Sequence, residues 1–113
     1  MARYCILEIE MELRRIKMKP SIALAERHEA VRKAAKRFRT ENPRVFGSVL
    51  HGTDSDGSDL DILVDALPDA TLFDLGGLQL ELEKLLDVPV DVVTPGDLPL
   101  KIRVQVLTEA RSI

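Results

Sequence analysis

The sequence has few residues of the kinds that cross-link a fold, span a membrane or stack on bases. Its single cysteine, Cys5, excludes an intrachain disulfide and a cysteine-based zinc site, which suits a reducing cytosol. With three Phe, one Tyr and no Trp, the core must be built from Leu, Val and Ile. No apolar run is long enough for a membrane span, and glutamates interrupt the apolar positions near the start, unlike a signal peptide. We therefore expect a cytoplasmic protein without a membrane partner.

The remaining composition is that of a small globular domain with an uneven charge. The chain has 113 residues, of which 45% are hydrophobic and 31% charged. Residues 1–46 carry 12 Lys and Arg against 6 Asp and Glu, whereas residues 47–113 carry 4 against 13. The basic half could face a nucleotide, a nucleic acid or an acidic partner, and the acidic half could attract a cation. From charge alone, two solvated helix faces are the simpler explanation of the asymmetry.

The first residues form a segment of their own. Residues 4–17 have apolar positions at helical spacing, and Pro20 ends the pattern. This segment is either a native extra helix or the product of an overcalled start, because Met18 could also begin the chain. We therefore divide the chain into an N-terminal extension over 1–19 and a domain over 20–113.

Within the domain, the periodicity of apolar residues predicts alternating helices and strands. The expected order is helix, strand, strand, helix, strand and final helix, over 21–39, 44–49, 60–65, 71–86, 88–94 and 95–110. Ser21 is the expected cap of the first helix, and Thr71 with Asp74 resembles a capping box. Three short strands cannot shield a core alone, so helices must cover the sheet. We expect an α/β (α+β) fold with a small mixed sheet of three to four strands packed with helices.

Two aspartates lie one residue apart in an otherwise apolar strand. Asp59 and Asp61 share one face of that strand, and the apolar residues between and after them take the other. Like charges at this spacing repel and are costly to bury, and a divalent cation would resolve the conflict. Asp91, in the third expected strand, would join them if the two strands are neighbours. Three such carboxylates suit a two-metal Mg²⁺ site for phosphoryl or nucleotidyl transfer; the alternative is a solvent-facing edge strand.

A Gly-Ser pair precedes the aspartates. Gly47 at a strand end lets backbone N–H groups approach phosphate oxygens closely, and the Ser48 hydroxyl can donate to a phosphate. We place Ser58 and His51 on the same phosphate side of the pocket. Other polar residues are not given a role there: His28 is expected on the apolar stripe of its helix as an interface residue, and we expect the carboxylates of Asp54, Asp56 and Asp65 to be solvated.

These residues together resemble a known signature. Gly47-Ser48, followed after ten residues by Asp59-Leu60-Asp61, is similar to the motif of the DNA polymerase beta-like nucleotidyltransferase superfamily. Over residues 20–113 the chain resembles its minimal nucleotidyltransferases (MNT), commonly the antitoxins of HEPN/MNT toxin–antitoxin pairs. The resemblance implies the nucleotidyltransferase fold, and a site in which Asp59, Asp61 and Asp91 hold two Mg²⁺ ions and Gly47 and Ser48 hold the triphosphate of ATP. It also implies transfer of AMP to a Tyr hydroxyl of a HEPN toxin.

The chain departs from this family pattern at one position. The segment after Gly-Ser often contains an Arg, and here "GSVLHG" has His51 instead, which is only partly charged at neutral pH. Phosphate charge would then be met by metal, backbone and Arg44, Lys101 or Arg103. The alternatives are therefore a non-catalytic antitoxin that neutralises its toxin by binding, and a nucleotide-binding subunit of a small-molecule nucleotidyltransferase. Direct nucleic-acid binding is not expected, because no aromatics interleave the basic stripe and the acidic half repels phosphate.

Overall fold

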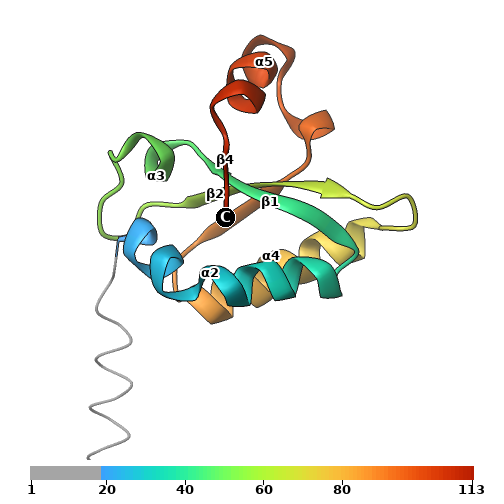
Figure 1. Cartoon of the computed structure of the whole chain (residues 1–113), viewed down its shortest axis with the longest axis horizontal. Helices are drawn as coiled ribbons and strands as arrows, with labels where there is room; N and C mark the ends of the chain where they lie inside the picture. Colours follow the sequence, from blue (N-terminus) through green and yellow to red (C-terminus); the bar gives the residue numbers. More distant parts are fainter. Residues whose placement is uncertain (1–18) are drawn as a thin grey trace, which may run out of the picture.

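The computed structural model describes residues 19–113 and forms one sheet with helices on both sides (Figure 1). Four strands are ordered β3-β2-β1-β4, over Val90–Val93, Leu60–Ala66, Thr40–Phe46 and Arg111–Ser112. β1 pairs antiparallel with β2 and β4, whereas β2 pairs parallel with β3. The expected α/β fold with a small mixed sheet is confirmed. The expectations for residues 1–18 lie outside the described part of the chain.

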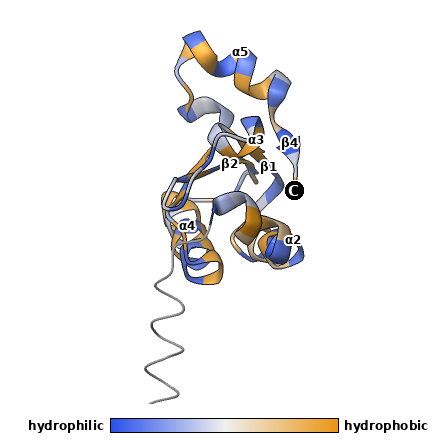
Figure 2. Cartoon of the chain, turned by 90° about the vertical axis from the view of Figure 1, so that its left-hand side faces the viewer, coloured by the Kyte–Doolittle hydropathy of each residue, from blue (hydrophilic) through white to orange (hydrophobic). Residues whose placement is uncertain are grey.

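The helices divide into two groups on opposite sides of the sheet. Helices α2 (Pro20–Arg37) and α4 (Leu72–Leu86) lie side by side against one face (Figures 1 and 2). On the other side lie the one-turn α3 (Ser48–His51) and α5 (Leu100–Glu109), with the short 3₁₀ helix η1 (Pro95–Asp97) leading into α5. Within residues 19–113 no helix is both long and apolar enough to cross a membrane.

The core lies between β2 and the pair α2 and α4. Alternation along β2 sends Leu60, Ile62 and Val64 toward the helices, where all three are fully buried. Helix α4 contributes the buried leucines Leu78, Leu82 and Leu86, and α2 contributes Val31, Ala34 and Ala35. Both helices thereby bury residues at helical spacing, in keeping with the periodicity that predicted them.

The start of α2 differs from the prediction in two ways. Ser21 does not cap the helix with its side chain; instead, its backbone N–H donates to Asp54 Oδ2 at 3.0 Å. Asp54, expected to be solvated, is therefore a buried cap supplied from the loop before β2. This hydrogen bond, more than any other influence, holds the pKa of Asp54 below its ordinary value of 3.8.

His28 was expected on the apolar stripe, and this prediction is wrong. The backbone of the preceding residue, Arg27, leaves the helical region (φ −127°, ψ 17°) and kinks α2. The stripe therefore does not continue through His28. Its ring is about half exposed and hydrogen-bonds to the carbonyl of Ala25 on its own helix.

Helix α4 begins at the predicted capping box. Thr71 Oγ1 accepts from the N–H of Asp74 and Asp74 Oδ2 accepts from the N–H of Thr71. Of the two glycines in this helix, Gly77 packs closely: a Cβ there would lie 2.7 Å from Cε1 of Phe38 on the turn after α2. A Cβ at Gly76 would meet nothing within 4 Å. Close packing therefore explains the glycine at position 77 but not the one at position 76.

Two boundaries around the sheet were not predicted. The expected strand over 44–49 begins earlier, at Thr40, and ends at Phe46, because Gly47 adopts a left-handed φ of +76° and starts α3. The chain end forms the two-residue β4 beside β1, with Ser112 opposite Arg44. Such a short strand exists only through pairing with a neighbour, which local periodicity does not reveal.

Candidate active site

The parallel pairing of β2 and β3 brings two of the three predicted carboxylates together. Asp61 lies directly opposite Asp91, and on its other side it lies opposite Phe46 of β1. Asp59 stands one residue before β2 begins. The condition on which Asp91 was included, that its strand lies beside the Asp61 strand, is therefore met.

Asp61 is the electrostatic centre of this group. Its carboxyl is partly buried, and this burial is the main reason that its pKa is raised above the ordinary value of 3.8. The nearby carboxylates of Asp91 and, less strongly, Asp59 raise the pKa further. Both of those residues are exposed. The strand thus carries one desolvated carboxyl flanked by two solvated ones of the same charge, an arrangement that a cation would relieve.

The donor set fits a hard cation in its chemistry, although it is not a preformed cage. Carboxylate oxygens are the ligands that Mg²⁺ takes, together with water and phosphate oxygens. Among residues 19–113, no group of three or more His, Cys, Asp or Glu side chains converges closely enough to hold a metal ion as it stands. Asp59 and Asp91 are exposed, so their side chains can turn toward Asp61 without displacing packed neighbours.

The Gly-Ser turn packs directly against Asp61. A Cβ at Gly47 would lie only 2.3 Å from Asp61 Oδ2, and the left-handed φ independently favours glycine. Ser48 follows as the first residue of α3. Ser58 shapes the connecting loop instead: its Oγ accepts from the N–H of Ser55 at 2.9 Å and lies 3.1 Å from Ser55 Oγ. The turn and the central carboxylate therefore form one continuous surface.

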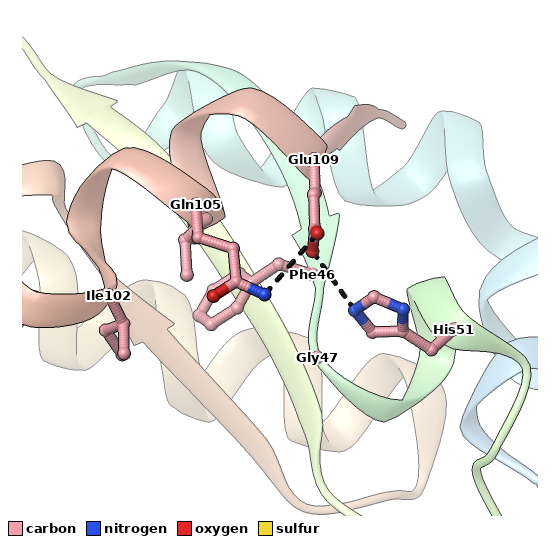
Figure 3. A pocket seen from close by; sticks show the side chains of 7 residues that line it. Phe46, Gly47, His51, Ile102, Gln105 and Glu109 are labelled. Carbon is pink, nitrogen blue, oxygen red and sulfur yellow. Dashed lines mark hydrogen bonds and ion pairs between the residues drawn. The ribbon is translucent and has the colours of Figure 1, made fainter.

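A cavity of about 240 Å³ adjoins this turn (Figure 3). Its lining comes from the end of β1, from α3 and from one side of α5: Phe46, Gly47, His51, Ile102, Gln105, Val106 and Glu109. His51 Nε2 lies 3.2 Å from Glu109 Oε2 across the cavity. Gln105 and Glu109 were not predicted as site residues, because only the tertiary placement of α5 brings them to the Gly-Ser turn.

The two arginines proposed to meet phosphate charge, Arg44 and Arg103, have structural partners. Arg44 Nη2 lies 2.6 Å from Asp65 Oδ1 and its side chain is largely buried. Asp65, which also accepts from Asn42, is therefore paired rather than solvated as expected. Arg103 donates to the carbonyls of Gly96 and Leu98 and so attaches α5 to η1. These bonds occupy both arginines within the fold.

Comparisons with known proteins agree with the fold of the chain. A family model for the nucleotidyltransferase domain matches residues 28–113. A solved structure provisionally described as a minimal nucleotidyltransferase is 42% identical, covers 85% of this chain and 97% of its own, and has a TM-score of 0.75. A toxin–antitoxin structure solved with AMP-PNP is 27% identical, covering 71% of this chain and 66% of its own, with a TM-score of 0.60. A variant of the toxin–antitoxin MntA-HpeT is 21% identical over 74% and 69% of the chains, with a TM-score of 0.61, and shares the fold. No curated protein matched.

Proposed function

Because this chain belongs to the family of nucleotidyltransferase domains, we propose that it transfers AMP from ATP to a hydroxyl group of a protein partner with the help of Mg²⁺. One observation carries the proposal. Asp61 lies in register with Asp91 and against Gly47, so the predicted metal ligands and the predicted phosphate-binding turn meet at one carboxylate. This juxtaposition suits a substrate that carries both a divalent cation and a phosphate chain.

Each residue of the site has a distinct part in this scheme. Asp59, Asp61 and Asp91 would hold the metal, and backbone N–H groups at Gly47 with the Ser48 hydroxyl would bind the triphosphate. Bound Mg²⁺ would supply positive charge that favours the ionised aspartates and offsets the phosphate charge. The acceptor oxygen forms a bond to the α-phosphorus while the bond to pyrophosphate breaks. Asp91, exposed at the sheet edge, is our candidate to take the proton of that hydroxyl.

The acceptor is proposed to be a Tyr of a HEPN-type toxin, for which this chain would be the antitoxin. The 27% identical neighbour is a toxin–antitoxin with a bound ATP analogue, which supports the pairing of a nucleotide with a protein partner. Helix α5 adds a physical argument. Its outer side exposes Leu100, Val104 and Leu107, which are 78%, 75% and 40% exposed. Their i, i+4, i+7 spacing forms an apolar stripe suited to a protein contact.

The test is label transfer from α-labelled ATP and Mg²⁺ to the cognate partner. We expect the wild-type chain to label the partner and both Asp59→Ala and Asp61→Ala to abolish labelling. The matched control is Asp69→Ala, which removes an equal charge and breaks only a surface ion pair with Arg39. Labelling that persists in both site variants would contradict the proposed metal ligands.

A second candidate function is neutralisation of the toxin by binding alone. It is favoured by His51, which stands where the family often has Arg and whose Nε2 lies 3.2 Å from Glu109 Oε2. The outer apolar stripe of α5 serves this function equally well. A variant with both Asp59→Ala and Asp61→Ala separates the two functions. Neutralisation that persists in it supports binding alone, whereas lost neutralisation with retained binding supports catalysis.

A further inference from the structure

The cavity beside the Gly-Ser turn has an unusual charge balance for a site that would receive a triphosphate. Two of its lining residues are ionisable, His51 from α3 and Glu109 from α5. The lining from β1 and the turn, Phe46 and Gly47, is uncharged, and the remainder of the α5 lining is apolar or amide. His51 is thus the one lining side chain that can carry positive charge, and only when protonated.

Glu109 contacts the His51 side chain. Its Oε2 lies 3.2 Å from His51 Nε2, and its Oε1 accepts from Gln105 Nε2 at 3.4 Å (Figure 3). The imidazole therefore points toward α5, and its contact with Glu109 spans the cavity. Gly47 lines the same cavity and touches Asp61, so the bridge stands beside the surface where phosphates are proposed to bind.

We propose that Glu109 regulates nucleotide binding by competing with the phosphate chain for His51. In the free protein Glu109 holds His51 across the cavity; on binding, a phosphate oxygen replaces Glu109 as the partner of His51. This inference rests on the proposed function and deepens it, because it names a side chain that lowers the affinity of the site for nucleotide.

The exposure of the pair makes such an exchange feasible. The side chains of His51 and Glu109 are 52% and 40% exposed, and ion pairs with this exposure are weak. A polyphosphate carries more charge than a carboxylate and binds a protonated imidazole more strongly. No side chain of helix α5 is fully buried, so its C-terminal turn can shift with little loss of packed contacts. Removal of the Glu109 charge should therefore raise the affinity for nucleotide, because His51 is then available to phosphate.

The test is a double-mutant cycle on MgATP binding, measured by isothermal titration calorimetry. The chains compared are wild type, Glu109→Gln, His51→Gln and the double variant. We expect Glu109→Gln to tighten binding by about two- to fivefold, the range for an exposed ion pair. We expect His51→Gln to weaken binding and to remove most of the gain from Glu109→Gln. Glu41→Gln is the matched control, because Glu41 is also exposed and stands at the other end of β1.

Two results would overturn the inference while leaving the proposed function intact. One is equal MgATP affinity in wild type and Glu109→Gln. The other is a gain from Glu109→Gln that persists fully in the His51→Gln background, because Glu109 would then only repel phosphate. If no chain in the cycle binds MgATP, the proposed function fails and the inference fails with it.

NMR spectroscopy can follow directly the replacement of Glu109 by phosphate as the partner of His51. The chain has two histidines, so His28, on the far side of the sheet, is an internal reference. We expect the imidazole NMR signals of His51 to shift on addition of MgATP, and to shift on Glu109→Gln without nucleotide, while those of His28 stay in place. His51 signals that do not respond to bound MgATP would overturn the exchange.

Discussion

The two faces of the sheet share their strands but differ in what they bury. Toward α2 and α4, Leu60, Ile62 and Val64 are completely excluded from water. The other face of the same strand carries the fully buried Leu63 and Asp61, whose burial is only partial and is unfavourable to its charge. Helix α5, on that side, has no fully buried side chain. Alternation along β2 thus places Asp61, which we expect to take part in the chemistry, on the face opposite the main core.

The largest expected effect comes from a substitution in the face of the sheet that packs against α2 and α4. Ile62→Ala should lower the free energy of unfolding by about 2–5 kcal/mol, because it leaves a cavity under α2 and α4. Val104→Ala, on the exposed side of α5, should change it by no more than about 0.5 kcal/mol. Urea unfolding of both variants gives the comparison. Similar losses in the two would mean that the faces do not differ in stability as described.

A smaller effect probes the contact between α4 and the end of α2. Gly77→Ala should lose about 1 kcal/mol net, because the new methyl group displaces the Phe38 ring. The neighbouring Gly76→Ala should instead gain about 0.5–1 kcal/mol from improved helix propensity, since open space surrounds it. Thermal unfolding distinguishes the signs. Equal shifts in the same direction would contradict the close packing at Gly77.

The loop before β2 contributes to the stability of the fold through Asp54, and this contribution depends on pH. Asp54→Ala should cost about 1 kcal/mol at pH 7, because it removes the cap on α2. The folded-state pKa of Asp54 is lowered, so this stabilisation is complete above the unfolded value of 3.8 and is lost as pH falls through the folded-state pKa. The difference from wild type should therefore shrink on acidification below that value. A constant difference from pH 7 to pH 2 would count against the capping role.

The smallest effect concerns the face of the sheet that carries Asp61. Here the substitution is expected to raise the free energy of unfolding. The folded-state pKa of Asp61 is raised, so its ionisation opposes folding as pH rises above the unfolded value of 3.8. Without metal, Asp61→Asn should therefore stabilise the fold at pH 7, on the order of 0.5 kcal/mol, and the gain should vanish in acid. Added Mg²⁺ should favour wild type instead. Asp69→Asn, on the exposed loop, is the control. Destabilisation by Asp61→Asn in metal-free buffer would contradict the charge conflict at this strand.

Local sequence signals were sufficient where one segment determines its own structure. Period-two alternation fixed which side of β2 faces the helices, and the Thr71–Asp74 capping box marked the start of α4. The Gly-Ser spacing and the two nearby aspartates located the candidate site. In each case the deciding interactions span only a few residues, or follow from geometry that every strand or helix shares.

Where interacting residues are distant in sequence, the prediction was wrong or could not be made. The cap that Asp54 provides joins residues 33 positions apart, and Asp65 finds Arg44 only through the pairing of β1 and β2. The kink at Arg27 turns His28 away from a stripe that periodicity alone would continue. The approach of Glu109 to His51 depends on where α5 lies. No local pattern encodes these contacts.

Above all, we claim that Asp61 and its neighbouring carboxylates hold the cation that brings the nucleotide. The most direct measurement is calorimetric titration of ATP into wild type and Asp61→Asn, each with Mg²⁺ and with chelator, and without any partner protein. We predict that wild type binds ATP only with Mg²⁺ and that Asp61→Asn binds it on the order of tenfold or more weakly. Because the same substitution should not weaken the fold, such a loss would reflect the site. Equal ATP affinity in the two proteins, or binding by wild type that persists with chelator, would contradict the claim.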